Sequence, residues 1–387
     1  MTLRVAVVGT SWKSIPPNGY GGIENVVFDL ITGSQELDIS FSLFSVGETV
    51  ESGKIPENVD VQWLFKKGMY PEITNEATKI WIEANHAMAA WEYVACGNID
   101  VIHDHSGIGF GMIAGSCMER PPILTTLHGP LTTPLIQQYY RFLSHKPGIY
   151  FNSISYAQRR DLPEIPYLGN VYNGVNLDGI PFEEHKQDYL LILGRITPFK
   201  GQKEAVEAAK RLGIKLVIAG TVEQNSQAIA YWRDIERELS ENIDGASDKI
   251  SCADEWLRRQ GDGVLYFGEA DTNQKFELFK NARATLMPIS WEEPFGLVMI
   301  ESLATGTPVV GFNQGSVSEI ISHGQNGFIV ENTEEMISAL RNIARISPFA
   351  CRESVRERFS HSVMARAYHE LYRKIEARRT PGFKSGE

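Results

Sequence analysis

The chain has 387 residues, of which 43% are hydrophobic and 22% charged, a composition typical of a soluble globular protein long enough for two domains. Its formal net charge of -11 argues against broad binding to nucleic acid. The four cysteines lie far apart without a C-x-x-C pair, which favours reduced thiols in a cytoplasmic protein over a zinc site.

The N-terminal segment predicts a strand followed by a ligand-binding loop. Residues 3–8 form an apolar run without the features of a signal peptide, and a Pro- and Gly-rich loop follows. Gly21 and Gly22 in this loop would let backbone approach a phosphate or sugar, although glycines often only form a turn. No G-x-G-x-x-G follows the strand and no G-x-x-x-x-G-K-[ST] occurs, so nicotinamide and P-loop sites lose support.

The next segments complete a first α/β domain. Residues 39–46 and 59–65 predict strands, and residues 75–96 predict a helix. The basic, aromatic loop at 66–70 is the candidate for membrane contact, but an ordinary solvated loop is the favoured interpretation because two lysines add little attraction. The domain ends near residue 178, before the polar linker 181–187.

Two predicted strands of this domain, residues 100–105 and 123–127, lead to histidines at their C-terminal ends. Imidazoles at that edge can bond sugar hydroxyls or stabilise charge, or serve as structural hydrogen-bonding groups. We expect His105 to contact an acceptor. Three histidines near a cleft could also indicate zinc, but no H-E-x-x-H motif supports that interpretation.

The second domain opens with a predicted strand at 189–193 that leads to Arg195 and Lys200. An arginine can grip a phosphate with two hydrogen bonds and a lysine adds a mobile charge, so together they could neutralise a diphosphate. Cations near a helix start also favour a bound anion over a purely structural role. No Asp-x-Asp occurs, so we expect no metal ion.

Residues 284–315 carry the strongest functional signal. A predicted strand at 284–289 is followed by a bend and by a helix that begins at Gly296. Glu293 lies in the bend and Glu301 about one turn inside the helix, and eight positions at helical rise cover ~12 Å. The two carboxylates could therefore contact opposite ends of a sugar nucleotide whose diphosphate lies at the helix N-terminus.

The segment from Glu293 to Glu301, read as EPFGLVMIE, resembles the E-x7-E signature of family 4 retaining glycosyltransferases with the GT-B fold. The resemblance implies that Glu293 binds donor-sugar hydroxyls and that Glu301 binds the ribose diol. It also implies that the backbone from Phe295 through Gly296 to Leu297 lines the sugar and the diphosphate.

Other residues acquire roles through the same resemblance. It implies that the loop at Gly21 and Gly22 closes over the substrates, that His128 lies beside the reaction centre, and that Gly268 meets the nucleotide base. Arg195 and Lys200 would bind phosphate.

The implied fold is α/β with two Rossmann-like domains, at residues 1–178 on the acceptor side and 179–360 on the donor side. A C-terminal helix at 361–387 would return to the first domain. Compared with the family, residues 241–262 are an insertion, which we expect to be peripheral because surface loops tolerate such additions; an oligomer contact is the alternative. The basic tail, residues 352–379, is expected to be helical with a solvated face.

The sequence thus predicts a retaining, metal-independent glycosyltransferase that uses a nucleotide-sugar donor, with a UDP-glucose type favoured. The acceptor is a carbohydrate, a lipid or a small molecule. An epimerase of the same fold and a sugar-nucleotide sensor without catalysis are the alternatives. An epimerase would need acid and base groups but no acceptor, and a sensor would not need the groups around the reacting carbon.

Overall fold

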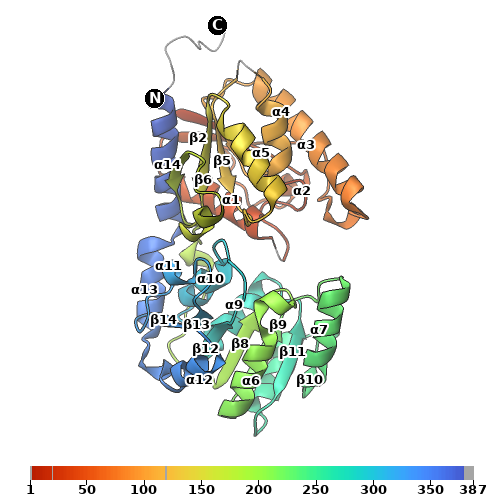
Figure 1. Cartoon of the computed structure of the whole chain (residues 1–387), viewed down its shortest axis with the longest axis vertical. Helices are drawn as coiled ribbons and strands as arrows, with labels where there is room; N and C mark the ends of the chain where they lie inside the picture. Colours follow the sequence, from red (N-terminus) through yellow and green to blue (C-terminus); the bar gives the residue numbers. More distant parts are fainter. Residues whose placement is uncertain (1, 20, 118–119, 379–387) are drawn as a thin grey trace. The chain divides into compact units, whose positions relative to one another are not determined.

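The computed structural model of the protein describes residues 2–19, 21–117 and 120–378. The chain divides into two compact units, one made of Met1–Asn176 with His361–Glu387 and the other of Leu177–Ser360. Each unit is built on a parallel sheet with helices packed against it (Figure 1). The prediction of an α/β protein with two Rossmann-like sheets is confirmed.

The sheet of the first unit has seven strands in the described part of the chain. Their order is β3 (Asp60–Trp63), β2 (Ile39–Ser45), β1 (Leu3–Val8), β4 (Val101–Asp104), β5 (Ile123–Leu127), β6 (Ile149–Ser153) and β7 (Tyr167–Asn170). All neighbouring pairs are parallel, and Val5 in the centre pairs with Phe41 on one side and Val101 on the other. The central strands are nearly continuous apolar runs because helices cover both of their faces.

Helices of the first unit cover the two faces of its sheet. They are α1 (Gly22–Gly33), α2 (Glu48–Glu51), α3 (Glu76–Cys96), α4 (Ile108–Ala114), α5 (Pro134–Ser144) and α14 (His361–Ala377), with short 3-10 turns η1 (Tyr70–Glu72) and η2 (Ala157–Asp161). α14 packs against α1, whereas α3 packs against α4. The last helix of the chain therefore completes the first unit.

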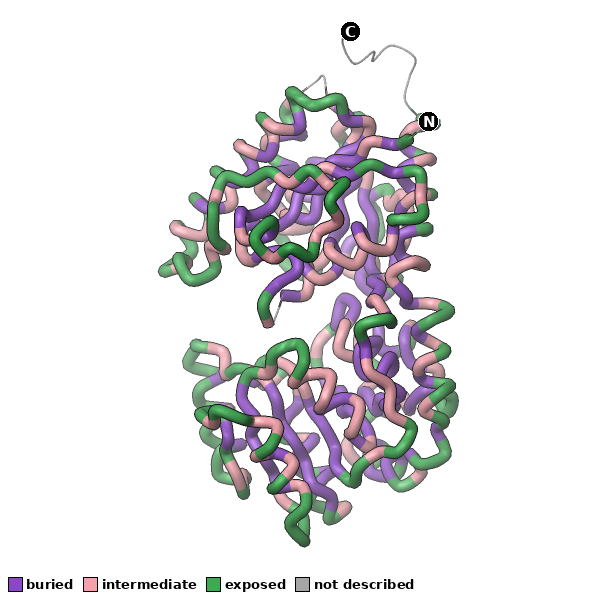
Figure 2. Tube along the Cα trace, turned by 180° about the vertical axis from the view of Figure 1, so that it is seen from behind, coloured by how far each residue is buried: buried purple, intermediate pink, exposed green. Residues whose placement is uncertain are grey.

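The second unit repeats this architecture. Its seven described strands have the order β10 (Glu241–Asn242), β11 (Val264–Gly268), β9 (Lys215–Ala219), β8 (Tyr189–Leu193), β12 (Ala284–Met287), β13 (Val309–Phe312) and β14 (Gly327–Val330). All pairs are again parallel. In both units most strands lie in the buried interior (Figure 2).

Two groups of helices pack on the second sheet. The helices are α6 (Gln202–Leu212), α7 (Ser226–Glu236), α8 (Lys249–Arg258), α9 (Thr272–Asn281), α10 (Leu297–Ala304), α11 (Val317–Ile320), α12 (Thr333–Arg341) and α13 (Pro348–Arg358), with the 3-10 turns η3 (Leu177–Gly179), η4 (Pro198–Lys200) and η5 (Ile343–Arg345). α6 packs with α7 and α12, whereas α10 packs with α9 and α13. No helix among the described residues is long and apolar enough to cross a membrane.

The segment 241–262, expected to be a peripheral insertion, lies at the edge of the second sheet but is not a simple surface loop. This segment supplies the edge strand β10 and the helix α8, and Trp256 is buried in an apolar cluster with Phe267 and Leu278. Ala253 lies three positions before Trp256, so both face this cluster from one side of the helix. The segment is part of the core because its apolar residues are spaced for a helix.

The basic tail also differs from the single helical stretch that was expected. α13 ends at Arg358 and belongs to the second unit, whereas α14 begins at His361 and belongs to the first. The backbone N–H of His361 donates to the carbonyl oxygen of Val175 at 2.9 Å, which ties the start of α14 to the first unit. Residue 379, the expected end of the tail, lies outside the described residues, as does the rest of 379–387.

Candidate functional site

In the second unit, the order of the strands reverses between the neighbours β8 and β12. From β8 the chain continues outward through β9, and from β12 it continues in the other direction through β13. Ligands of open parallel sheets bind beyond the strand ends at such a switch point. Arg195 and Lys200 follow β8, and Glu293 follows β12. The topology thus brings the loops that carry these residues to one edge of the sheet.

Lys200 and Glu293 are in direct contact in this position. The ammonium group of Lys200 donates a hydrogen bond to Oε2 of Glu293 at 2.6 Å, and the two side chains are only 20% and 11% exposed. The same ammonium group lies 5.0 Å from the centroid of the Trp291 ring, within the range of a cation–π interaction. The pair was not predicted, because 93 positions separate its two members along the chain.

The loop that carries Glu293 is held from behind by the segment before α11. Gly315 has φ +56°, and a Cβ atom there would lie 2.3 Å from the backbone nitrogen of Glu293. The N–H of Ser316 donates to the carbonyl oxygen of Glu293 at 3.0 Å, and its hydroxyl donates to the carbonyl oxygen of Phe295 at 2.6 Å. Any side chain at position 315 would displace this loop, so the glycine is needed for the position of Glu293.

Arg195 has a different partner. Its guanidinium donates to Oε1 of Glu223 at 2.8 Å, and the two side chains are 48% and 36% exposed. The carbonyl oxygen of Arg195 accepts a hydrogen bond from the buried Gln202 at 3.0 Å, which fixes the backbone of the loop. The guanidinium is thus held by one exposed carboxylate that a phosphate could replace. Sequence reasoning missed Glu223 because no motif surrounds it.

Gly296 is the N-cap of the helix α10, at the predicted start of the helix. Gly296 has φ +79°, a left-handed conformation that favours glycine, and no side chain caps the helix. The first N–H groups of an α-helix have no partner within the helix, and its N-terminus carries partial positive charge. Phe295 and Gly296 therefore lead into a helix end suited to an anion, and Leu297 is its first residue.

Glu301, on this helix, also forms a largely buried pair with a lysine. Nζ of Lys275, on α9, donates to Oε1 of Glu301 at 2.6 Å, and the side chains are 16% and 10% exposed. Lys275 was not identified from the sequence, because its position within a predicted helix is also that of an ordinary surface lysine. Its contact depends on how α9 packs against α10.

The separation of ~12 Å expected between Glu293 and Glu301 rested on an incorrect assumption. That value requires helical rise over all eight positions. The helix covers only Leu297 to Ala304, and the residues from Glu293 to Gly296 are irregular. Glu293 still precedes the start of the helix and Glu301 still lies within it, but helix geometry does not give the distance between them.

Gly268, expected to meet the nucleotide base, lies at an irregularity in the pairing of β11 with β9. Its φ is +77°, and a Cβ atom there would lie 1.6 Å from Oδ1 of Asp244. The carbonyl oxygen of Gly268 accepts a hydrogen bond from the N–H of Gly220 at 2.8 Å. Position 268 thus requires a glycine for packing, and its contact with the base stays a prediction.

In the first unit, Gly21 and Gly22 form the start of α1. A Cβ atom on Gly21 would lie 2.7 Å from Cγ of Pro17, so a side chain would strain the loop. Glu24, in the first turn, is buried and accepts a hydrogen bond of 2.5 Å from the hydroxyl of Thr10. Burial raises the pKa of Glu24. Gly21 therefore has a structural reason, and closure of the loop over substrates stays a prediction.

The histidines at the ends of β4 and β5 lie together. Nδ1 of His105 is 2.8 Å from Nε2 of His128, and the two rings are stacked with centroids 5.0 Å apart. His105 is 1% exposed and its other nitrogen lies 3.2 Å from His103, so little of it remains for the expected contact with an acceptor. Burial lowers the pKa of His128 to about 4, and its side chain is neutral at pH 7.

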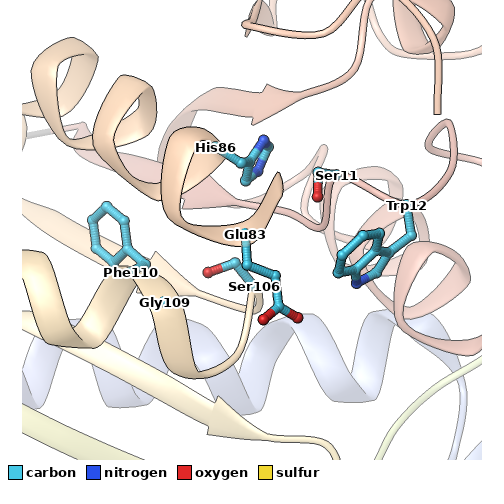
Figure 3. Close-up of a pocket in the computed structure, with 7 residues that line it drawn as sticks. All are labelled: Ser11, Trp12, Glu83, His86, Ser106, Gly109 and Phe110. Carbon is cyan, nitrogen blue, oxygen red and sulfur yellow. The ribbon is translucent and has the colours of Figure 1, made fainter. Parts of the chain in front are cut away.

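A small pocket opens at the switch point of the first sheet, between β1 and β4. Figure 3 shows Ser11 and Trp12 after β1, Ser106 after β4, and Glu83 and His86 from α3 around it. Its interior has room for about one water molecule. Nε2 of His86 lies 2.9 Å from the carbonyl oxygen of Gly9, whereas its buried Nδ1 has no partner among the described residues.

Burial also sets the charge of this pocket. The pKa of His86 is lowered to about 4 by burial, so the ring is neutral near pH 7. Burial raises the pKa of Glu83. The pocket therefore offers hydrogen-bonding groups and a carboxyl group. None of the described residues that line it is a lysine or an arginine.

Among the described residues, no group of three or more His, Cys, Asp or Glu side chains lies close enough together to hold a metal ion. The positively charged groups at the second switch point are the side chains of Lys200 and Arg195 and the N-terminus of α10.

Comparisons with known proteins agree with this architecture. Residues 177–348 match the family model for glycosyl transferases group 1. An N-acetyl-alpha-D-glucosaminyl L-malate synthase of Bacillus anthracis is 31% identical over 312 residues, 71% of this chain and 74% of that protein. Matches with two uncharacterized relatives, from Klebsiella pneumoniae and Methanocaldococcus jannaschii, cover 36% and 31% of the relatives' own lengths. The chain thus spans about a third of each of these two proteins.

Solved structures share the fold. A glycosyltransferase involved in avilamycin A biosynthesis superimposes with a TM-score of 0.67 at 24% identity, over 97% of this chain and 98% of that one. An Anabaena protein crystallised with UDP-glucose gives a TM-score of 0.66 at 16% identity, over 96% and 100%. These likenesses show the GT-B fold, and the match with the synthase shows the family. The chain belongs to the group 1 glycosyltransferases.

Proposed function

We propose that the protein is a retaining glycosyltransferase of family 4 that transfers a sugar from a nucleoside diphosphate to an acceptor without a metal ion. The observation that carries this proposal is the contact between Lys200 and Glu293 at the switch point of the second sheet. A largely buried lysine there can face a diphosphate while it fixes a carboxylate beside the sugar.

The groups around α10 support an order for the donor. Glu293 would bind sugar hydroxyls, and Lys200, Arg195 and the N–H groups at the start of α10 would bind the diphosphate. Glu301 would accept hydrogen bonds from the ribose diol, because Lys275 occupies Oε1 and leaves Oε2 for another donor. Glu301 is about 7% exposed, so its carboxylate is held in one orientation.

The chemistry follows from the charge of the leaving group. As the bond between the anomeric carbon and the phosphate oxygen breaks, negative charge grows on the diphosphate. Lys200, Arg195 and α10 then stabilise it more strongly than in the ground state. In a retaining transfer, the acceptor oxygen forms its bond on the face that the phosphate leaves, and the acceptor proton passes to the departing phosphate oxygen. No side chain has to form a covalent intermediate.

The donor is proposed to be of the UDP-glucose type. The Anabaena protein of the same fold was crystallised with UDP-glucose, which supports a uridine nucleotide as the first candidate.

At the first unit's switch point, the pocket with His86 and Glu83 lacks cationic side chains among its lining residues. It favours hydroxyl groups of an acceptor over an anionic group.

Incubation with UDP-glucose tests the proposal. Slow release of glucose and UDP, or transfer to an added sugar, is the expected result. A new sugar nucleotide without released UDP would indicate an epimerase, and tight binding without turnover would indicate a sensor. A thermal-shift series with UDP, GDP and ADP sugars then identifies the base, because a ligand of the folded state raises its melting temperature.

A further inference from the structure

The buried histidines of the first unit form a continuous hydrogen-bonded chain that reaches the C-terminal helix. Nδ1 of His103 lies 2.6 Å from the hydroxyl of Tyr372 on α14, and Nε2 lies 2.8 Å from the hydroxyl of Thr126 on β5. The chain continues from His103 to His105 and from His105 to His128. It thus joins a residue of α14 to the imidazole beside the proposed reaction centre.

The direction of this chain is set at its buried end. Tyr372 is fully buried, and the contact of its hydroxyl within the described residues is Nδ1 of His103. A buried hydroxyl hydrogen needs an acceptor, so the hydroxyl of Tyr372 donates and Nδ1 of His103 accepts. His103 then carries its proton on Nε2 and donates it to the hydroxyl oxygen of Thr126.

The next step passes this constraint to His105. Its Nε2 lies 3.2 Å from Nδ1 of His103, which is an acceptor. Nδ1 of His103 has one lone pair, so a hydrogen on Nε2 of His105 shares it with the hydroxyl hydrogen of Tyr372 in a longer three-centre contact. An unprotonated Nε2 would instead turn a second lone pair toward it, so Nε2 of His105 carries a hydrogen. Its Nδ1 is therefore the acceptor, and Nε2 of His128 donates to it at 2.8 Å.

The branch at Thr126 is compatible with this assignment. The hydroxyl of Thr126 lies 3.0 Å from that of Tyr368, and Tyr368 lies 3.2 Å from the amide of Asn152. One polar atom of the Asn152 amide contacts Tyr368, and the other is buried without a hydrogen-bond partner among the described residues. This remains true if the amide is turned over so that its oxygen and nitrogen exchange places. With its oxygen toward Tyr368, the hydrogens of Thr126 and Tyr368 both find acceptors.

We propose that Tyr372 is a positioning residue that fixes His128 as the tautomer with its proton on Nε2. Nδ1 of His128 is then a lone-pair acceptor, suited to receive a hydrogen bond from a substrate hydroxyl. His128 is not a proton donor to the leaving group in this arrangement. This inference rests on the proposed function only in placing His128 beside the substrate.

Burial of the imidazoles supports the same assignment. Burial lowers the pKa of His103 and His105 well below the usual value of 6.5, and of His128 to about 4. All three rings are thus neutral at pH 7, so each carries its single proton on either Nδ1 or Nε2. A reversed chain would leave the hydrogen of Tyr372 without its acceptor, at a cost expected for a buried unpaired polar group.

The test is nitrogen-15 NMR of the full chain labelled at histidine, with His128→Gln to assign the signal. In the wild-type protein, the proton of His128 should reside on Nε2. Tyr372→Phe should shift the population toward the Nδ1 tautomer. Tyr189→Phe is the matched control, since it removes a buried hydroxyl that donates to the carbonyl oxygen of Leu278 in the second unit and has no part in the histidine chain, and it should leave His128 unchanged.

Kinetics give a second readout. Tyr372→Phe should lower kcat by roughly 10-fold, a size typical of removing a partner that orients a functional imidazole, without changing UDP affinity. A wild-type His128 protonated on Nδ1 would overturn the inference even if Tyr372→Phe failed to fold. An unchanged tautomer in folded Tyr372→Phe would overturn the role of Tyr372. Absence of any transfer by the wild type would contradict the proposed function instead and leave the tautomer result intact.

Discussion

The ammonium group of Lys200 lies 2.6 Å from Oε2 of Glu293, so the two residues assigned to the diphosphate and to the sugar share a hydrogen bond. Lysine has three donor hydrogens, and this bond uses one of them. The pair can therefore align the carboxylate beside the sugar while the ammonium group still faces a phosphate.

Replacing Lys200 should weaken the transition state more than the ground state. Lys200→Ala removes positive charge facing a leaving group whose charge grows during the reaction, so kcat should decrease by on the order of 10²–10³ with a smaller rise in the donor's KM. Steady-state kinetics measure this split. Lys203→Ala is the matched control, because Lys203 is 46% exposed and pairs with Asp234, and it should retain wild-type rates.

The two glutamates should have separable effects on nucleotide binding. Glu301→Ala should weaken binding of UDP by about 1–3 kcal/mol, since hydrogen bonds to a charged group are lost from the ribose. Glu293→Ala should slow transfer strongly and leave UDP affinity nearly unchanged. Isothermal titration calorimetry with UDP distinguishes them, and equal losses in both variants would reverse the assignment.

Lys275 extends this prediction to a residue that the sequence did not identify. Lys275→Met keeps the length of the side chain but removes the charge that orients Glu301. UDP affinity should therefore decrease, whereas Lys280→Met should not affect it, because Lys280 on the same helix pairs with Glu277. Unaltered UDP binding by Lys275→Met would show that Glu301 needs no partner.

Arg195 tests whether a planar, two-pronged contact with phosphate is used. Arg195→Lys should recover only part of the activity lost in Arg195→Ala, because an ammonium group cannot form the bidentate bond of a guanidinium. Glu223→Gln removes the charge of the carboxylate that accepts a hydrogen bond from Arg195 at 2.8 Å. The KM of the donor should therefore stay unchanged or decrease. A large loss of activity in Glu223→Gln would mean that this ion pair is required for positioning.

The stability of the first unit should decrease in mild acid. Burial lowers the pKa of four histidines below the usual 6.5. The pKa of His86 and of His128 is lowered to about 4, and the pKa of His103 and of His105 is lowered well below 6.5. The unfolded chain therefore binds protons below pH 6.5 that the folded chain does not. Each histidine removes up to about 1.4 kcal/mol of unfolding free energy per pH unit between pH 6.5 and 4.

Buried acids act in the opposite direction. Burial raises the pKa of Asp104 to about 6, so the folded state binds a proton there that the unfolded state releases above about pH 4. Asp104 thus offsets part of the loss caused by the histidines between about pH 6 and 4, and the melting temperature should still decrease from pH 6.5 to pH 5. Thermal denaturation of His86→Gln should show a shallower pH dependence than the wild type, and His185→Gln, with a 92% exposed side chain, should match the wild type.

Much of this fold could be predicted because the signals were local. The apolar runs at β1, β8 and β12 are long and bounded by glycine or proline, and the helix at Gly296 has a left-handed glycine at its start. The packing of the segment 241–262 was not predicted, because the helical spacing of Ala253 and Trp256 does not show which other elements bury them.

The candidate site shows the same division. Glu293, Glu301 and Lys200 were found from motif and spacing, but their partners were not. Lys275 lies 26 positions from Glu301, and Glu223 lies 28 positions from Arg195. Such pairs depend on how whole elements pack, as does the link from His103 to Tyr372 across 269 positions. The sequence indicates which charged groups are present, whereas the tertiary structure determines which of them are paired with an opposite charge.

Proton NMR of the turnover of UDP-glucose in the presence of EDTA tests the central claim most directly. Retention without a metal predicts that UDP appears and that the first glucose released, or the first linkage formed with an acceptor, has the α configuration of the donor. The rate should be unchanged by EDTA. A β product, or activity that EDTA abolishes and manganese restores, would contradict the account.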